Sequence, residues 1–230
     1  MSNQIQLTVA IPSYLEAENL KFLLPQLKEA LKDIPNYEIL IVDTPEARDE
    51  TPDVCKENGV RYINRDGGDT YSAAVTTAIA KAEGEFLLFM DGDGSHDPNL
   101  IPELFSHRND YDIVAASRYV GGGSTDNNAV LGLMSKTLNL TYRIVLNLDA
   151  YDISNSFKLY HTAPLRDLTL YCTNFDIIEE IMVKLNRIKK VKVKEIPFHF
   201  RERVHGETKR NLVTFIFSYA STLIKLRFGK

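Results

Sequence analysis

The alternation of short apolar runs with segments of helical periodicity constrains the fold of this chain more than any other feature. Each run is apolar almost throughout, which is typical of strands buried on both faces of a parallel sheet. Strands that alternate with helices in this way form βαβ units. The sequence therefore predicts an α/β fold with a Rossmann-like, mostly parallel sheet flanked by helices. The runs are Leu7–Ile11, Ile39–Val42, Val60–Ile63, Phe86–Met90 and Ile113–Ala116, and the helical segments between them span 18–31, 51–58, 72–82 and 98–105.

The second half of the chain is less regular. It predicts helices over Val130–Leu146 and Phe175–Arg187, and strands over Ser156–Tyr160 and Val191–Ile196. A chain of 230 residues suits one globular domain, which we assign to residues 1–210. Residues 211–230 are rich in aliphatic and aromatic side chains and end with basic ones, which predicts a C-terminal amphipathic helix. This helix either packs on the domain or on a second subunit, or it lies on a membrane surface with its basic residues as anchors.

Charge and composition limit which binding partners and which cellular compartment we expect for this protein. The net charge of −4 and the pI of about 5.8 argue against a nucleic-acid partner. The chain has no basic leader and no run of the roughly 18 apolar residues that cross a bilayer. We therefore expect a cytoplasmic protein, either free or peripheral on the cytoplasmic face of a membrane. Cys55 and Cys172 lack a metal-binding or redox spacing and are predicted to be free thiols.

Polar residues follow several of the predicted strands directly. They are Pro12–Glu16 after the first strand, Asp43 after the second, Asp91 and Asp93 after the fourth, and Ser117 and Arg118 after the fifth. In an open α/β sheet, ligands bind at the carboxyl ends of the strands. The sequence thus predicts one ligand site at this edge of the sheet.

The segment MDGDGSHDP, which follows the fourth strand, is the strongest candidate for a metal site. Alternate residues of an extended segment point the same way, so Asp91 and Asp93 can converge on Mg²⁺ or Mn²⁺, with diphosphate oxygens completing the shell. Gly92 leaves room for a nucleotide ribose near the backbone. The alternative is a plain turn, since Asp, Gly, Ser and Pro all favour turns. His96 is predicted to be a hydrogen-bonding residue of this loop, and Asp97 to cap the following helix.

Several motifs occur in a fixed order along nearly the whole chain. Together they resemble the inverting GT-A glycosyltransferases of the dolichyl-phosphate mannose synthase family. The resemblance implies a GT-A fold and metal-assisted transfer of a hexose, from a GDP- or UDP-sugar to a polyprenyl or dolichyl phosphate. The motifs are IPSYLEAENL at 11–20, LIVD at 40–43, MDGDGSHDP at 90–98, ASRYVGGG at 116–123, DISNSFKLY at 152–160 and FRERVHGETK at 200–209.

The resemblance also implies roles for single residues. Pro12, Tyr14, Glu16 and Asp43 would hold the nucleotide, and Asp91, Gly92 and Asp93 its diphosphate. Asp91 and Asp93 would bind the metal, with Ser95 where a further ligand can sit. Catalysis would rest on Asp93 and on the phosphate contacts of Arg118, Arg203 and Lys209, because arginine binds phosphate in a bidentate manner and lysine adds a point charge. Taken one at a time, these cations could also be solvated surface charges.

The chain departs from the family pattern in three places. Thr44 replaces the second aspartate after the second strand. The stretch from Arg65 to Ser72 lacks the usual lysine and contains Asp69 instead. In the acceptor-phosphate motif, Leu131 replaces the leading arginine, while Ser135, Lys136 and Asn139 are kept and are predicted to contact the acceptor.

Other functions remain open from the sequence. Transfer to a glycan or small-molecule hydroxyl would need a carboxylate base, for which Asp176, Glu179 and Glu180 are candidates, unless they form a solvated helix face. A lipid phosphate needs no base, because its oxygen is already ionised. A degenerate, non-catalytic nucleotide-binding relative is a further alternative. A membrane-anchored partner subunit and a homo-oligomer also stay open.

Overall fold

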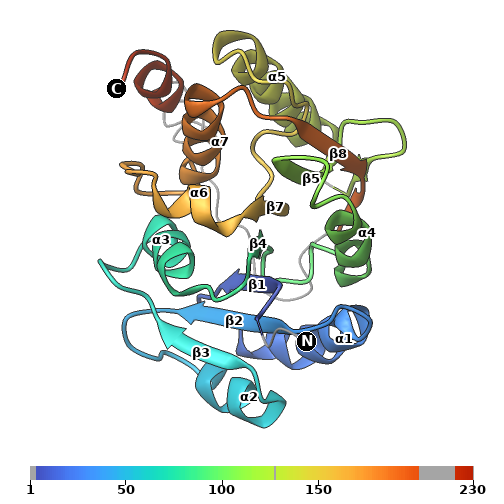
Figure 1. Cartoon of the computed structure of the whole chain (residues 1–230), viewed down its shortest axis with the longest axis vertical. Coiled ribbons are helices and arrows are strands. Elements are labelled where there is room, and N and C mark those ends of the chain that lie inside the picture. Colours follow the sequence, from blue (N-terminus) through green and yellow to red (C-terminus); the bar gives the residue numbers. More distant parts are fainter. Residues whose placement is uncertain (1–3, 127, 202–220, 230) are drawn as a thin grey trace.

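The computed structural model describes residues 4–126, 128–201 and 221–229 and is built around a central sheet. Its seven strands lie in the order β3-β2-β1-β4-β7-β5-β8 (Figure 1). Strand β7 is antiparallel to both of its neighbours, and every other pairing is parallel. The strands are β1 Leu7–Pro12, β2 Tyr37–Asp43, β3 Arg61–Asn64, β4 Phe86–Phe89, β5 Ile113–Ser117, β7 Lys158–His161 and β8 Val193–Pro197. A parallel pair, β6 Ser124–Thr125 with β9 His199–Phe200, forms a second small sheet.

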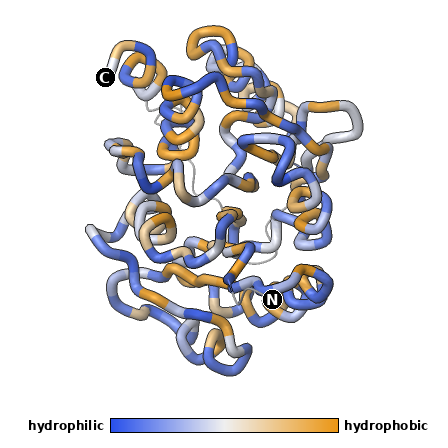
Figure 2. The backbone as a smooth tube through the Cα atoms, in the orientation of Figure 1, coloured by the Kyte–Doolittle hydropathy of each residue, from blue (hydrophilic) through white to orange (hydrophobic). Residues whose placement is uncertain are grey.

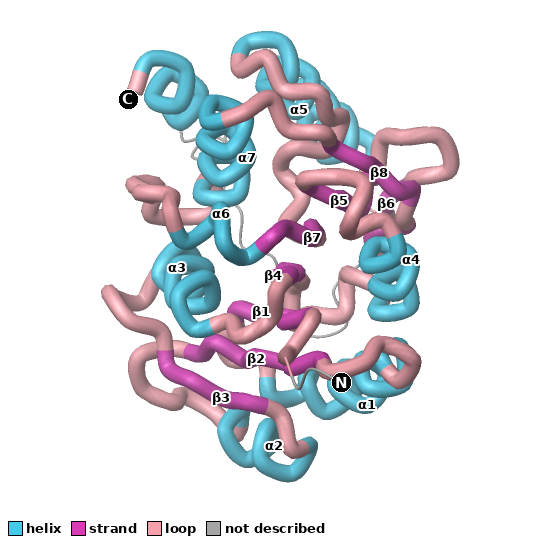
Figure 3. Tube along the Cα trace, viewed as in Figure 1, coloured by secondary structure: helices cyan, strands magenta, loops and turns pink. Residues whose placement is uncertain are grey.

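Helices cover both faces of the central sheet (Figure 3). One face carries α1 Ala17–Leu31, α2 Thr51–Asn58 and α4 Ile101–Ser106, with the short 3-10 turn Pro98–Leu100 before α4. The other face carries α3 Tyr71–Lys81, α6 Thr162–Arg166 and α7 Ile177–Ile188, and α5 Ala129–Val145 contributes to the same side. Each face has its own apolar cluster, and the strands β1, β2, β4 and β5 are largely buried between them, whereas the edge strands β3 and β8 are only partly buried. Burial on both sides is the reason why the inner strands are almost wholly apolar in sequence.

The predicted fold class is confirmed, and the predicted strands and helices lie within a few residues of the observed ones. The antiparallel direction of β7, the helix α6 and the strands β6 and β9 were not predicted. A short apolar run carries no signal of direction. Its orientation is set by the length and path of the chain that enters and leaves it.

The described part of the C-terminus packs on the domain. Residues 221–228 are helical, Leu226 is buried in the same cluster as α7, and the Arg187 guanidinium donates to the carbonyl of Leu226. The remainder of the predicted helix over 211–230, and the predicted domain boundary at residue 210, lie outside the described residues. Among the described helices, none combines the length and the hydrophobicity that crossing a bilayer requires.

Candidate functional site

The antiparallel direction of β7 brings the residues of the candidate site together. The parallel strands β1, β2, β4 and β5 end at one edge of the sheet, where Asp43 and Ser117 are the last residues of β2 and β5. Because β7 runs the other way, its first residue, Lys158, lies opposite Phe89 at the end of β4. The segment 150–157 that precedes β7 therefore arrives at the same edge. It lies between the ends of β4 and β5 and contacts both.

The acidic element is held by its own loop and by this segment. Asp91 Oδ1 accepts a hydrogen bond from Ser156 Oγ at 3.0 Å, and the Asp91 N–H donates to His96 Nδ1 at 3.0 Å. Asp93 Oδ1 accepts from the Ser95 N–H at 3.0 Å and from Ser95 Oγ at 2.6 Å. His96 is buried, which lowers its pKa, so it is the neutral hydrogen-bonding residue that the sequence predicts. The Asp97 cap is also confirmed, since its carboxylate accepts from the Asn99 N–H at 3.0 Å.

The donor set at this loop fits Mg²⁺ or Mn²⁺ when a ligand shares the ion. The Asp91 side chain is 30% exposed, and Asp93 lies beside it in the loop with 9% exposure. Within the described ranges, no group of three or more His, Cys, Asp or Glu side chains could hold a metal ion by itself. Two carboxylates are hard oxygen donors, and the remaining positions would be filled by oxygens of a bound diphosphate. Ser95 donates to Asp93 and is buried, so its observed role is to orient that carboxylate.

Gly92 is explained first by packing. A Cβ atom at this position would lie 3.1 Å from Ile11 Cγ2 and 3.7 Å from Glu16 Cγ. Glycine thus lets the acidic loop pack closely against β1 and the loop that follows it. The predicted room for a ribose stays a prediction.

The residues predicted to hold the nucleotide line the ends of β1 and β2. Tyr14 is 51% exposed, whereas Glu16 and Asp43 are buried. Pro12 is the last residue of β1, and Glu16 accepts from the Asn19 side chain just inside α1. Asp43 accepts from the Tyr62 hydroxyl at 3.1 Å, and burial raises the pKa of its carboxyl. Of these four predicted residues, Tyr14 is the one whose side chain is exposed.

Two of the departures from the family pattern meet in space. Arg48, from the altered loop after β2, pairs with Asp69, from the altered loop after β3, at 2.7 Å. The Arg48 guanidinium also lies over the Tyr14 ring, 5.5 Å from its centroid. Arg65 donates to the carbonyl oxygens of Ser13 and Asp43 and so ties the same loops together. Arg48 and Arg65 were not predicted as site residues, although Arg65 begins the altered stretch 65–72 and Arg48 lies in the same loop as the altered Thr44.

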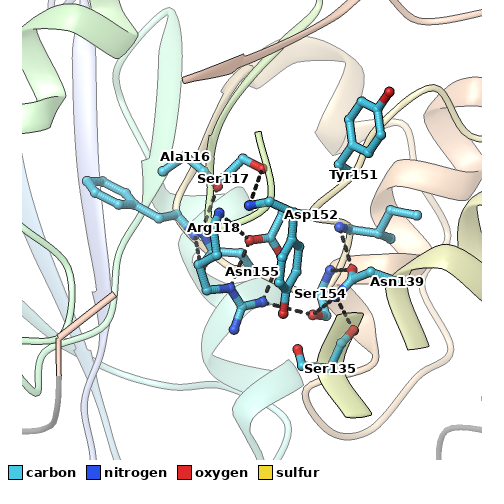
Figure 4. A network of polar contacts seen from close by, with 12 residues as sticks. Ala116, Ser117, Arg118, Ser135, Asn139, Tyr151, Asp152, Ser154 and Asn155 are labelled. Atoms are coloured by element: carbon cyan, nitrogen blue, oxygen red, sulfur yellow. Dashed lines mark hydrogen bonds and ion pairs between the residues drawn. The ribbon is translucent and has the colours of Figure 1, made fainter. Parts of the chain in front are cut away.

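Arg118 is the central cation of a polar network at the end of β5 (Figure 4). Its Nε and Nη2 atoms donate to the two carboxylate oxygens of Asp152 at 2.8 and 2.7 Å, and its backbone N–H donates to Asp152 at 2.9 Å. The Arg118 side chain is 10% exposed and Asp152 is fully buried. The alternative that Arg118 is a solvated surface charge is therefore wrong.

Asn139 joins α5 to this network. Its Oδ1 accepts from the N–H groups of Ile153 and Ser154 at 2.7 and 3.0 Å. Its Nδ2 donates to the Ser135 carbonyl at 2.8 Å and to Ser154 Oγ at 3.0 Å, and Ser154 Oγ also accepts from Arg118. Protein groups thus occupy both ends of the amide. Of the predicted acceptor residues, Asn139 is buried within the protein, Ser135 is half-buried and Lys136 is exposed.

A buried cation holds the segment 150–157 in place. Lys158 is fully buried, and its Nζ donates to the carbonyl oxygens of Ile153, at 3.0 Å, and Asn155. One segment therefore connects the acidic element through Ser156, the arginine through Asp152 and the helix α5 through Ser154. The site depends on this segment more than on any single strand end.

The prediction that Glu179 and Glu180 form a solvated helix face is wrong. Both are buried, because α7 turns this side toward the sheet. Glu180 accepts from the N–H groups of Tyr171 and Cys172 and pairs with Lys184 at 2.7 Å. Asp176 is half-buried and accepts from Thr222 Oγ1 at 2.8 Å. The Glu180 carboxylate is therefore occupied by contacts that hold residues 171 and 172, which precede α7, in place.

Glu179 makes stability depend on pH. Burial raises the pKa of its carboxyl to about 8, so the folded protein keeps a proton that the unfolded chain releases above about pH 5. This contribution is complete below the unfolded pKa and is lost as the pH rises through 8. Burial lowers the pKa of Lys158 to about 8, and below that pH Lys158 is charged in both states.

We therefore expect Glu179→Gln to flatten the pH dependence of unfolding. Between about pH 5 and 8, the wild type should lose about 3 kcal/mol of unfolding free energy relative to the variant. Urea unfolding at several pH values measures this difference. Glu103→Gln, at an exposed position of α4, is the matched control and should keep the slope of the wild type. Parallel slopes for the wild type and Glu179→Gln would contradict the assignment.

A small cavity adjoins the acidic loop on the side of α1. Its volume is about 130 Å³, and Asn19, Phe22, Gly94, His96 and Arg201 are among the residues that line it. Binding sites for small molecules usually measure about 300–1,000 Å³. The cavity is too small for a nucleotide-sugar, so we expect the donor at the edge of the sheet where Asp91 is partly exposed and Tyr14 is exposed. Arg203 and Lys209, the remaining predicted phosphate contacts, lie outside the described residues.

Comparison with known proteins is consistent with this geometry. The model of the family described as glycosyl transferase family 2 matches residues 8–169. A dolichol-phosphate mannosyltransferase of Pyrococcus furiosus is 34% identical over 96% of this chain, and the chain spans only 64% of the length of that relative. An undecaprenyl-phosphate mannosyltransferase of Micrococcus luteus is 30% identical over 86% of this chain and 85% of its own.

A solved structure shares the fold. Glucosyl-3-phosphoglycerate synthase from Mycobacterium tuberculosis, in complex with Mn²⁺, uridine diphosphate and glucosyl-3-phosphoglycerate, superposes with a TM-score of 0.75 at 15% identity. The match covers 98% of this chain and 80% of that one. The predicted GT-A architecture is thereby confirmed.

Proposed function

The chain belongs to glycosyl transferase family 2, and on that premise we propose that it transfers a hexose from a nucleotide-sugar to a polyprenyl phosphate, with inversion at the anomeric carbon. The observation that carries the proposal is the segment 150–157. It connects the acidic element Asp91–Asp93, which suits a metal-bound diphosphate, with Arg118, which suits a phosphate. The acceptor class comes from the names of the relatives in Pyrococcus furiosus and Micrococcus luteus.

The residues at the site can take defined roles in this reaction. Asp91 and Asp93 would hold Mg²⁺ or Mn²⁺, which would neutralise negative charge on the diphosphate leaving group. Tyr14, with Arg48 across its ring, would cover the nucleotide near Pro12, Glu16 and Asp43. Arg118, held by Asp152, would contact phosphate together with Ser135 and Lys136 of α5. By the motif resemblance, Arg203 and Lys209 would add further phosphate contacts.

The reaction requires no carboxylate base. A phosphate monoester has its second pKa near about 6, so the acceptor oxygen is ionised at neutral pH. It attacks the anomeric carbon on the side opposite the diphosphate, forms the new carbon–oxygen bond and displaces the nucleoside diphosphate with the electron pair of the broken bond. Positioning and charge neutralisation then supply the rate. Burial of Glu179 and Glu180 weighs against a hydroxyl acceptor that needs a base from α7. We place the reaction on the cytoplasmic face of a membrane.

Thermal unfolding with candidate donors tests the proposal. GDP or UDP at 100 times its dissociation constant, with Mg²⁺ or Mn²⁺, should stabilise the protein by about 2.7 kcal/mol. For a domain of this size that corresponds to a rise in Tm of about 5–10 °C. The rise should shrink when EDTA removes the metal. If no nucleoside diphosphate raises the Tm with either metal, the proposal is wrong. Transfer of labelled sugar to a polyprenyl phosphate then identifies the acceptor.

A further inference from the structure

A series of four side chains leads from the interior of the protein to the edge of the sheet where we expect the donor. They are Arg65, Asp69, Arg48 and Tyr14, and each lies beside the next. Asp69 and Arg48 come from the two loops, after β3 and β2, in which the sequence departs from the family pattern. Both loops are hydrophilic along most of their length (Figure 2). The ion pair between them is therefore a feature of this chain rather than of the motifs that it shares with the family.

Arg65 is the buried end of this series. Its side chain is 4% exposed, and its guanidinium donates to the carbonyl oxygens of Ser13, Asp43 and Thr70. These carbonyls lie where the chain leaves β1, where it leaves β2 and where it enters α3, so one buried cation joins three loops at the donor edge. The Arg65 Nη1 atom also lies 3.7 Å from Asp69 Oδ1. The Asp69 carboxylate thus faces a cation that is itself held in place.

The second carboxylate oxygen of Asp69 holds Arg48. Asp69 Oδ2 lies 2.7 Å from Arg48 Nη2. The Arg48 Nη1 atom donates to the Tyr14 hydroxyl at 3.3 Å, and the guanidinium carbon lies 5.5 Å from the centre of the Tyr14 ring. At that distance a cation is attracted by the π-electrons of the ring. Asp69 therefore directs Arg48, and Arg48 contacts both the hydroxyl and the ring of Tyr14.

Tyr14 lies in a loop whose backbone is unusual and whose side chains are poorly covered. Its own residue is 51% exposed, and a side chain this exposed changes rotamer readily unless a neighbour holds it. The next residue, Leu15, has a φ of 56°, a left-handed conformation that a residue with a Cβ atom rarely adopts. Such conformations occur preferentially at sites where a ligand binds. The contacts with Arg48 are what hold the Tyr14 ring at this place.

We propose that the ion pair of Arg48 and Asp69 is a positioning device, which holds the Tyr14 ring in the orientation that receives the nucleoside of the donor. Arg48 and Asp69 act through Tyr14, and Tyr14 makes the contact with the ligand. Because the ring is ordered before the donor arrives, binding loses less side-chain entropy than it would with a mobile ring. The ligand in this role is the donor of the proposed function, on which the proposal therefore rests.

Calorimetric titration of the whole protein with GDP and with UDP, each in the presence of Mn²⁺, tests the proposal. For the nucleotide that binds the wild type, Asp69→Asn should raise the dissociation constant about three- to tenfold, the factor expected for ordering one side chain on binding. In a transfer assay it should raise the KM for the donor by the same factor and leave kcat unchanged, because the reacting atoms keep their contacts. Asp69→Glu keeps the charge and should recover most of the affinity.

Glu83→Gln is the matched control for the loss of an exposed ion pair. Glu83 pairs with Arg61 at 2.9 Å, and it precedes β4, at the opposite edge of the sheet from the candidate site. This variant should keep the donor KM of the wild type. Exposed ion pairs contribute little to stability, so neither Glu83→Gln nor Asp69→Asn should change the Tm by more than about 3 °C. A larger fall in Tm for Asp69→Asn, with an unchanged donor KM, would show that the pair serves only the fold and would overturn the proposal.

A second set of variants separates the positioning of Tyr14 from a direct contact between Arg48 and the donor. In a Tyr14→Ala background, Asp69→Asn should have no further effect on the dissociation constant, because no ring is left to position. An undiminished effect in that background, or tighter binding by Asp69→Asn alone, means that Arg48 meets the diphosphate directly, and the proposal is then wrong. Equal dissociation constants for the wild type and Asp69→Asn overturn the proposal while the proposed function stands. If the wild type binds no nucleoside diphosphate, the proposed function fails and this role of the ion pair fails with it.

Discussion

Asp93→Asn is expected to reduce sugar transfer by about 10²–10³-fold, an effect comparable with the loss of one preorganised charge-stabilising group. The amide keeps an oxygen that can accept from the Ser95 N–H and hydroxyl, so the loop should keep its shape. What the variant loses is the negative charge that would hold the divalent ion beside the diphosphate. We expect the rise in Tm with nucleoside diphosphate and metal to disappear, while the Tm without ligand stays close to that of the wild type.

The matched control lies in the same loop. Asp97→Asn changes an aspartate that caps the turn Pro98–Leu100 and pairs with Arg201. It should cost no more than about 1 kcal/mol of stability and should leave the metal-dependent rise in Tm intact. The kcat/KM of both variants shows whether Asp93, rather than Asp97, belongs to the metal site. An Asp93→Asn protein with wild-type transfer, or an Asp97→Asn protein with the larger loss, would contradict the assignment of the metal site.

Asp152→Ala is expected to be the most destabilising substitution at the site. Asp152 is fully buried, and it accepts from the Arg118 side chain and backbone. Removing one partner of a buried ion pair leaves an uncompensated charge and typically costs about 3–5 kcal/mol. In a chain of this size that lowers the Tm by roughly 10 °C. Glu29→Gln breaks the exposed pair with Lys32 and should cost less than about 0.5 kcal/mol.

A double variant separates stability from activity at the same pair. Arg118→Met/Asp152→Leu replaces both charges with apolar side chains, which often restores or exceeds the original stability. We expect it to recover most of the lost Tm but none of the lost transfer, because the cation proposed to meet phosphate is gone. Scanning calorimetry and a transfer assay measure the two effects. If the double variant is active, Arg118 serves only the fold.

The amino-acid sequence by itself determines the architecture and the edge at which the site lies. Uninterrupted apolar runs such as Ile39–Val42 can be satisfied only when both faces of a strand are covered, and that requirement leads to a sheet between two layers of helices. Residues directly after such strands, among them Asp43, Asp91 and Arg118, must gather at one edge because parallel strands end together. Local rules also sufficed for the Asp97 cap and for the hydrogen-bonding role of His96.

Only the tertiary structure decided how the parts of the site are connected. The direction of β7 depends on the path of about 40 preceding residues, and that direction brings Asp152, Ser154 and Ser156 to the strand ends. The pairing of Arg48 with Asp69 joins two loops whose alterations look unrelated along the chain. Which side chains of a helix are buried is also decided by the tertiary structure, because it depends on what packs against that helix. Glu179 and Glu180 are buried and Leu140 and Ile144 exposed because α7 packs against the sheet, whereas α5 buries only its narrow side around Asn139 and Tyr142.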